Sequence, residues 1–164
     1  MKARQTALGG VTAALAVVVM CLGGLVPLAT YILPMLCCIL LQLILPSLGK
    51  QGGWVWYCAV GLLSVLLCPD KEAAAVWVFL GYYPLLKPLL DRKKAAIVYK
   101  LLLFNAATLT MYILLIHLLG MAALAAEFQE MGTLLTAITL ALGNLCFFLL
   151  DRMLTIFSKK RPGV

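Results

Sequence analysis

The residues that could carry chemistry are few in this sequence, and their spacing suits no common reactive site. The chain has six cysteines but a single histidine, and no two cysteines form a CxxC pair. These counts argue against a zinc or iron–sulfur site, so we expect the cysteines to act as small apolar side chains. There is also no P-loop, no GxSxG and no HExxH motif. The sequence therefore predicts no enzymatic activity, no metal and no cofactor.

A first set of polar and aromatic residues falls near the ends of apolar stretches. It combines phenols, hydroxyls, one carboxylate and one imidazole. Apolar walls with a few orienting polar groups are typical of a small-molecule pocket. Interfacial tyrosine and tryptophan are equally typical of an aromatic belt, so both interpretations stay open. The candidate binding residues are Tyr31, Glu72, Trp77, Tyr112, His117, Thr133 and Thr136.

A second polar set lies at similar depth near the other end of three apolar stretches. Lys87 and Asp151 fall at the boundary of this layer and have opposite charges, so we expect them to pair. The layer is either hydrogen bonding between helices or an inner gate that senses a partner. Its members are Tyr83, Lys87, Asn105, Asn144 and Asp151.

The composition indicates whether the segments that carry these residues lie in water or in a lipid bilayer. Hydrophobic residues make up 65% of the 164 residues, charged residues make up 12%, and mean hydropathy is +1.09. A soluble domain of this size has too little interior to bury so much apolar surface, and disordered chains are far more polar. We therefore predict an all-α polytopic membrane protein, with residues 1–164 forming a single transmembrane domain.

Six apolar stretches are predicted to cross a bilayer, given that one crossing needs about 20 residues. The third stretch is short for a crossing unless the membrane thins or Trp54 and Trp56 anchor its edge. Turn residues or charges separate them, as in the glycine-rich segment 49–53 and the charged segment 91–94. The expected spans are 7–26, 28–45, 54–68, 73–90, 97–119 and 133–150.

The charges predict the direction of these spans. With six spans and a cytoplasmic N-terminus, 12 of the 13 lysines and arginines lie on the inner side, and Lys71 lies on the outer side. Four acids, Asp70, Glu72, Glu127 and Glu130, lie on the outer side. This distribution follows the positive-inside rule, so we expect both termini in the cytoplasm and the protein in a bacterial plasma membrane. The net charge of +7 then reflects topology and does not indicate nucleic-acid binding.

The first apolar stretch carries small residues four apart. Gly9 and Ala13 form one such pair, and Gly10 and Ala14 form the next. Small residues at this spacing let another helix approach closely. The neighbouring helix could belong to this chain or to a different protein.

The stretch from Gly81 to Pro88 has two prolines four apart and leads into a basic segment. It is typical of an elbow that lies on the inner membrane surface. We expect it to contact anionic lipid, with docking of a cytosolic partner as the alternative.

The pattern resembles the substrate-binding (S) component of energy-coupling factor transporters, which are small six-helix proteins with both ends inside. The segment that carries the resemblance is the alanine-rich stretch 6–16, directly after a short basic N-terminus. The resemblance implies that Gly10 and Ala14 face a coupling (T) component that works with two ABC ATPases. It also implies a vitamin-like ligand in the outer half of the bundle. The chain also resembles small membrane proteins of Gram-positive anaerobes that have no assigned role.

A second resemblance leads to a different function. The cell-shape protein MreD has similar size and six helices, and it acts as a scaffold without transporting a solute. An outer cavity of ligand size would favour transport, whereas a closed outer half would favour the scaffold.

Overall fold

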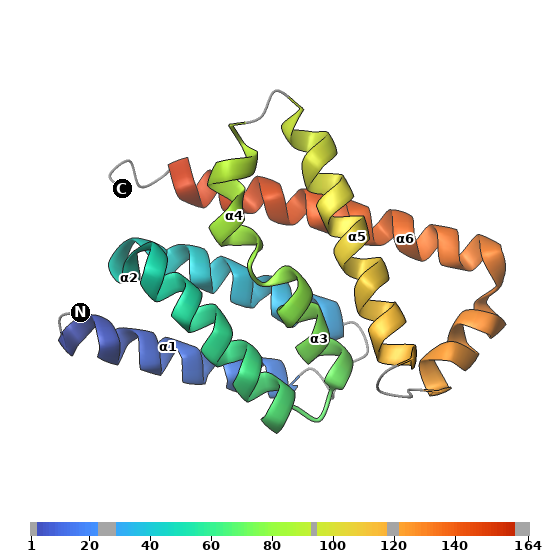
Figure 1. Ribbon diagram of the computed structural model, residues 1–164, viewed down its shortest axis with the longest axis horizontal. Coiled ribbons are helices and arrows are strands. Elements are labelled where there is room, and N and C mark those ends of the chain that lie inside the picture. The colour runs from blue at the N-terminus through green and yellow to red at the C-terminus, as the bar shows by residue number, and fades with distance from the viewer. Residues whose placement is uncertain (1–2, 23–28, 93–94, 118–121, 160–164) are drawn as a thin grey trace.

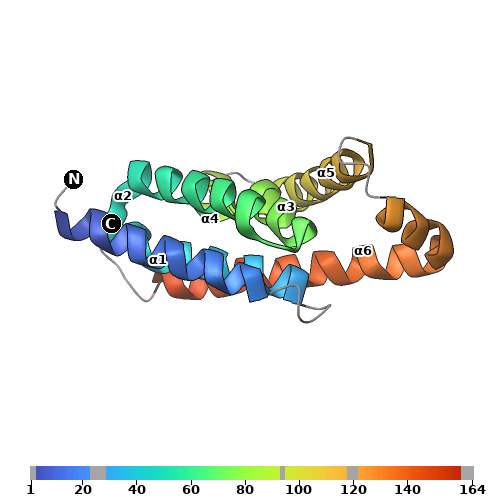
Figure 2. The same ribbon diagram turned by 90° about the horizontal axis from the view of Figure 1, so that it is seen from below.

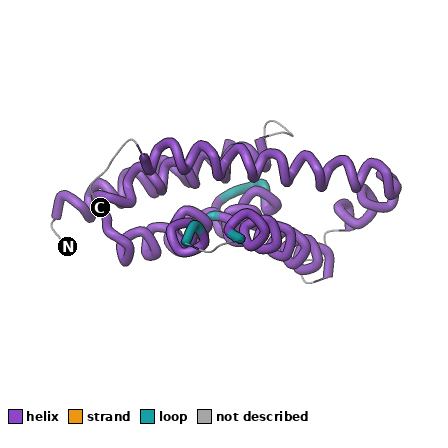
Figure 3. The backbone as a smooth tube through the Cα atoms, turned by 90° about the horizontal axis from the view of Figure 1, so that it is seen from above, coloured by secondary structure: helices purple, strands orange, loops and turns teal. Residues whose placement is uncertain are grey.

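The computed structural model describes residues 3–22, 29–92, 95–117 and 122–159, with the side chains at 29, 122–131, 133–136 and 159 outside the description. Within these ranges the chain is helical and has no strand (Figure 3). The helices are α1 (Ala3–Cys21), α2 (Ala29–Leu67), α3 (Lys71–Leu80), α4 (Tyr83–Leu90), α5 (Ala96–His117) and α6 (Ala122–Lys159).

Five helical segments in the described part are long and apolar enough to cross a membrane. Two of them are α1 and α5, and a third is the combined unit Lys71–Leu90. The others are Thr30–Leu67 and Ala137–Ser158. The prediction of an all-helical protein compatible with a multi-pass membrane location is therefore confirmed.

Helix α2 reverses direction at Gly49, and its two halves lie against each other (Figure 1). Gly49 has φ 72° and ψ 172°, a backbone conformation that side chains with a Cβ rarely adopt. The sequence analysis expected a turn over 49–53 and a third span that begins at residue 54. The observed turn is shorter than expected, because the helix continues to residue 48 and resumes at residue 50. Gly53 is already buried against Leu45 and Leu85.

The expected span 73–90 is two helices with a break at residues 81 and 82. Helix α3 begins at its cap Asp70, whose carboxylate accepts hydrogen bonds from the backbone N–H groups of Glu72 and Ala73. Helix α3 ends at Gly81, a position where a larger residue would not fit. A Cβ there would lie 2.5 Å from the Trp77 carbonyl oxygen and 2.7 Å from its ring.

The core lies where α1 and the two halves of α2 pack against α3 and α4. Ala16 and Met20 of α1 are fully buried in it. Trp56 and Trp77 meet edge to face with centroids 5.8 Å apart, a favourable aromatic geometry. This packing fixes the relative position of α2 and α3.

Hydrogen bonds group the helix termini at two ends of the molecule. At one end the side chain of Gln5, near the start of α1, donates to the carbonyl of Ser47, just before the α2 turn (2.8 Å). The start of α1, the α2 turn and the end of α6 lie on the same side in two views (Figures 1 and 2). At the other end the Thr30 hydroxyl of α2 donates to Asp70 (2.8 Å). We call these the lysine end and the tyrosine end, after Lys87 and Tyr31.

Helix α6 has a second glycine turn, at Gly132 (φ 65°), and then runs without interruption to Lys159. The expected sixth span, 133–150, begins directly after this glycine, and the helix continues nine residues beyond residue 150. The extra length brings Thr155 and Ser158 beside α4 at the lysine end.

Replacing Gly49 tests the turn of α2. We expect Gly49→Ala to lower the free energy of unfolding by about 1 kcal/mol, because alanine is strained at positive φ. A Cβ at Gly49 meets no atom within 4 Å, so the effect isolates the backbone. Unfolding by titration with SDS in mixed micelles would measure it.

Gly10→Ala is the matched control, because its Cβ also meets no atom within 4 Å and its backbone is helical. We expect it to be neutral or slightly stabilising. Equal effects of the two substitutions would contradict the assigned turn.

Candidate functional site

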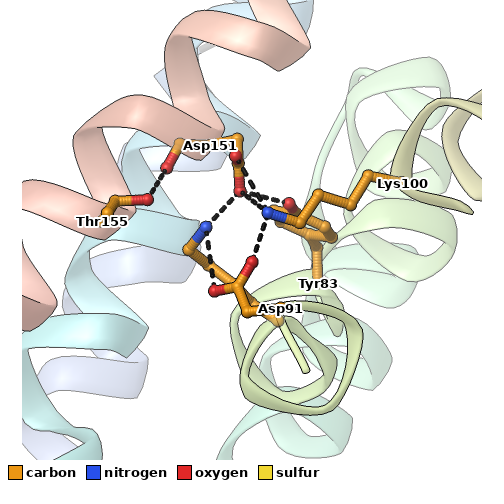
Figure 4. Close-up of polar contacts among 6 residues, drawn as sticks. Tyr83, Asp91, Lys100, Asp151 and Thr155 are labelled. Atoms are coloured by element: carbon orange, nitrogen blue, oxygen red, sulfur yellow. Dashed lines mark hydrogen bonds and ion pairs between the residues drawn. The ribbon is translucent and has the colours of Figure 1, made fainter. Parts of the chain in front are cut away.

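Two lysines and two aspartates form a closed ring of ion pairs at the lysine end (Figure 4). Lys87 contacts Asp151 and also lies 3.5 Å from Asp91. Lys100 lies 3.0 Å from Asp151 and also contacts Asp91. The lysines are only 4% and 7% exposed, so each needs an opposite charge nearby. The four charges cancel.

Asp151 is the centre of this ring. Its Oδ1 accepts from both lysines and from the Tyr83 hydroxyl, which lies 2.5 Å away. The Thr155 hydroxyl donates to the Asp151 carbonyl one helical turn along (2.8 Å, Figure 4). The Asp151 carboxylate thus connects α6 to both α4 and α5.

The predicted inner layer is divided between this ring and a separate amide pair. Lys87 and Asp151 are in contact, as expected from their charges and depth. Asn105 and Asn144 hydrogen-bond each other in both directions, at 2.9 and 3.1 Å. Tyr83 bonds to the ring and not to the amides.

Sequence reasoning missed Asp91 and Lys100 as ring members, because both were counted as charges of an inner loop. The spacing of Lys87 and Asp91 was a usable signal, since residues four apart on a helix face each other. Lys100 gave no comparable local signal. Its partner Asp151 is 51 residues away in the sequence.

A second polar cluster joins three helices at the tyrosine end. The oxygens of Tyr31, Glu72 and Tyr112 form a triangle whose sides measure 2.5, 2.5 and 2.8 Å. Tyr31 belongs to α2, Glu72 to α3 and Tyr112 to α5. Three of the predicted binding residues are therefore brought together, and Tyr31 is 39% exposed.

The triangle contains one carboxylate and two phenols. Each phenol has one O–H to donate and a carboxylate can only accept, so Glu72 is the acceptor for both tyrosines. The negative charge of Glu72 has no counterpart within the triangle, unlike the charges of the lysine ring, which cancel. A bound group with an N–H or O–H could donate to this carboxylate.

Trp77 and His117 do not join the triangle. Trp77 is fully buried, and its indole N–H donates to the Tyr57 carbonyl (3.3 Å). His117 is exposed at the end of α5. The side chains of Thr133 and Thr136 lie outside the described ones.

The small residues of α1 point in two directions. Gly9 and Ala13 face the interior, where a Cβ on Gly9 would lie 3.2 Å from Leu48. Gly10 and Ala14 are exposed, and the space beside Gly10 is open. The pair Gly10 and Ala14 therefore remains available to a helix outside this chain.

No protein-family model, curated protein or solved structure matches this sequence. Among the described residues no group of three or more histidine, cysteine or acidic side chains is arranged to hold a metal ion. The assignment of function therefore depends on the two polar clusters and on α1.

Removing the charge at the centre of the ring should destabilise the protein. We expect Asp151→Asn to lower the free energy of unfolding by about 3 kcal/mol, because two buried ammonium groups lose a shared carboxylate. Unfolding by SDS titration would measure the change.

Asp91→Asn provides a control within the same ring. The Asp91 side chain is 44% exposed and that of Asp151 only 18%, so water replaces more of the lost interaction at Asp91. We expect a loss below about 1 kcal/mol. A larger loss for Asp91→Asn than for Asp151→Asn would contradict the central role of Asp151.

Proposed function

We propose that the protein is the substrate-binding subunit of an energy-coupling factor type transporter in a bacterial plasma membrane. It captures a small, vitamin-like nutrient from outside, at the tyrosine end. It acts with a T component and two ABC ATPases, because the chain has no nucleotide-binding motif of its own. The observation that carries the proposal is the triangle of Tyr31, Glu72 and Tyr112, which gathers one carboxylate and two phenols from three helices and exposes Tyr31.

The proposal includes six membrane crossings with both termini in the cytoplasm. The two halves of α2, on either side of Gly49, count as separate crossings because they run in opposite directions (Figure 1). The unit Lys71–Leu90 counts as one crossing. The ring then faces the cytoplasm and the triangle faces outward, in agreement with the positive-inside rule.

The two clusters suit different steps of transport. The triangle accepts a ligand that offers an N–H or O–H group. The ring joins α4, α5 and α6 and acts as the inner gate, closed while its four ion pairs are intact. Reorientation driven by the ATPases would then release the ligand inside.

The exposed pair Gly10 and Ala14 is the proposed contact with the T component. Small residues four apart allow close helix packing in a membrane, where tight van der Waals contact drives association. Gly9 and Ala13 already pack within the chain. They support the position of α1 and leave the outward face to the partner.

Labelling of introduced cysteines tests the orientation. We expect Gln129→Cys to react with a membrane-impermeant thiol reagent only from outside, because the helical segment before the Gly132 turn lies there in the proposed topology. The background would carry serine at the exposed cysteines Cys58 and Cys146. Gln51→Cys, beside the α2 turn, is the matched control and should react only from the cytoplasm. Labelling of Gln129→Cys from the cytoplasm would rule out the proposed topology.

Association with the transporter is tested by tagged purification from mildly solubilised native membranes. We expect a T component and two ABC-type ATPases to co-purify, and Gly10→Leu to abolish this by filling the small-residue face. Ala106→Leu places the same side chain on the exposed face of α5 and should leave the complex intact.

The co-purifying proteins also decide between the two candidate functions. Normal complex formation by Gly10→Leu would remove the basis for the T-component contact. Recovery of wall-synthesis or cell-shape proteins would replace the transport proposal with an MreD-like scaffold.

A further inference from the structure

A cavity of about 260 Å³ lies beside the ion-pair ring, between α2, α4 and α6. Its polar lining comprises Gln42, Lys87, Asp91, Thr155 and Ser158. At about 30 Å³ for each water, it has room for roughly eight water-sized groups. That is enough for a small polar head group.

One polar atom of the residues that line the cavity is buried without a hydrogen-bond partner in the described part of the chain. The side-chain oxygen of Gln42 is buried and accepts no hydrogen bond from the described residues. Buried carbonyl oxygens almost always have a donor, so the cavity calls for a group with an N–H or O–H. Asp91, half exposed at the cavity wall, is a second acceptor for such a group.

The same cavity also offers donors. Lys87 has three N–H groups and contacts two carboxylates, which leaves one N–H for a bound anion. The Ser158 hydroxyl adds another donor. One lysine and one aspartate line the cavity, so their charges balance and favour a ligand with one positive and one negative group.

The surroundings of the cavity identify a source for such a ligand. Leu89 follows the lining residue Pro88, and Ile156 follows Thr155, and both are about half exposed. In a membrane these side chains face lipid, so an acyl chain can lie on them while its head group enters the cavity. Basic segments at the inner membrane surface also attract the negative groups of lipid head groups.

We propose that this cavity binds a head group that carries a primary ammonium and a phosphate, supplied by a phosphatidylethanolamine-type lipid. The ammonium donates to the Gln42 oxygen and to the Asp91 carboxylate. The phosphate accepts from Lys87 and Ser158. This site is separate from the triangle and does not depend on whether the protein transports a nutrient.

The test compares two lipids that differ mainly at the nitrogen. Phosphatidylcholine keeps the phosphate and the positive charge but replaces every N–H by a methyl group. We expect native mass spectrometry of the purified full-length protein to show preferential retention of phosphatidylethanolamine by about fivefold, the contribution of one net hydrogen bond.

Substitutions in the cavity locate the effect. Gln42→Leu removes the orphan oxygen at similar volume and should abolish the preference without loss of stability. Ser158→Phe fills the cavity without touching the ring and should reduce retention of phosphatidylethanolamine. Gln51→Leu, at an exposed position near the α2 turn, is the matched control and should keep the preference.

Two results would overturn the proposal. Equal retention of the two lipids by the unmodified protein would show that water alone fills the cavity. An unchanged preference in Gln42→Leu would place the lipid elsewhere. A further arm uses soluble phosphoethanolamine: binding of this compound at the Gln42 site, with no lipid preference, would keep the head-group chemistry but overturn the lipid as its source.

Discussion

The need to neutralise two buried ammonium groups determines how the lysine end of this protein is built. Lys87 and Lys100 are almost inaccessible to water, and an unpaired charge in such a place is very costly. Asp151 satisfies both from a third helix, and Asp91 closes the ring from the end of α4. The axial and rotational positions of α4, α5 and α6 must all agree for the four contacts to form together. Packing of apolar side chains alone would specify that register far less sharply.

The tyrosine end follows a different principle, although it also joins three helices. Its triangle combines two phenols with one carboxylate, and the charge of that carboxylate is not balanced within the triangle. A satisfied network resists change, because every alternative loses an interaction. A carboxylate whose charge is not balanced within its cluster gains an interaction when a ligand brings a donor. The contrast between the two ends is the physical basis for placing capture at the triangle and closure at the ring.

The sequence predicted the parts of this arrangement that follow from hydropathy and charge. Apolar stretches indicated the helices, and the opposite charges of Lys87 and Asp151 at similar depth indicated their contact. The position of the α2 turn was not predictable to the residue, because Gly49 is one of three glycines in that segment and only its backbone angle distinguishes it. Lys100 was missed because its partner lies on another helix, and pairing across helices depends on rotations that hydropathy does not determine.

The cavity beside the ring extends the same reasoning to a ligand. Gln42 lines the cavity and its oxygen accepts no hydrogen bond from the described residues, while the charges of Lys87 and Asp91 nearby already balance. A ligand that enters must therefore bring both a donor and an acceptor, or it disturbs a ring whose integrity holds three helices together. A purely anionic group would compete with Asp91 for Lys87, and a purely cationic group would compete with Lys87 for Asp91. A head group with both charges adds to the ring without opening it, so binding there leaves the four ion pairs intact.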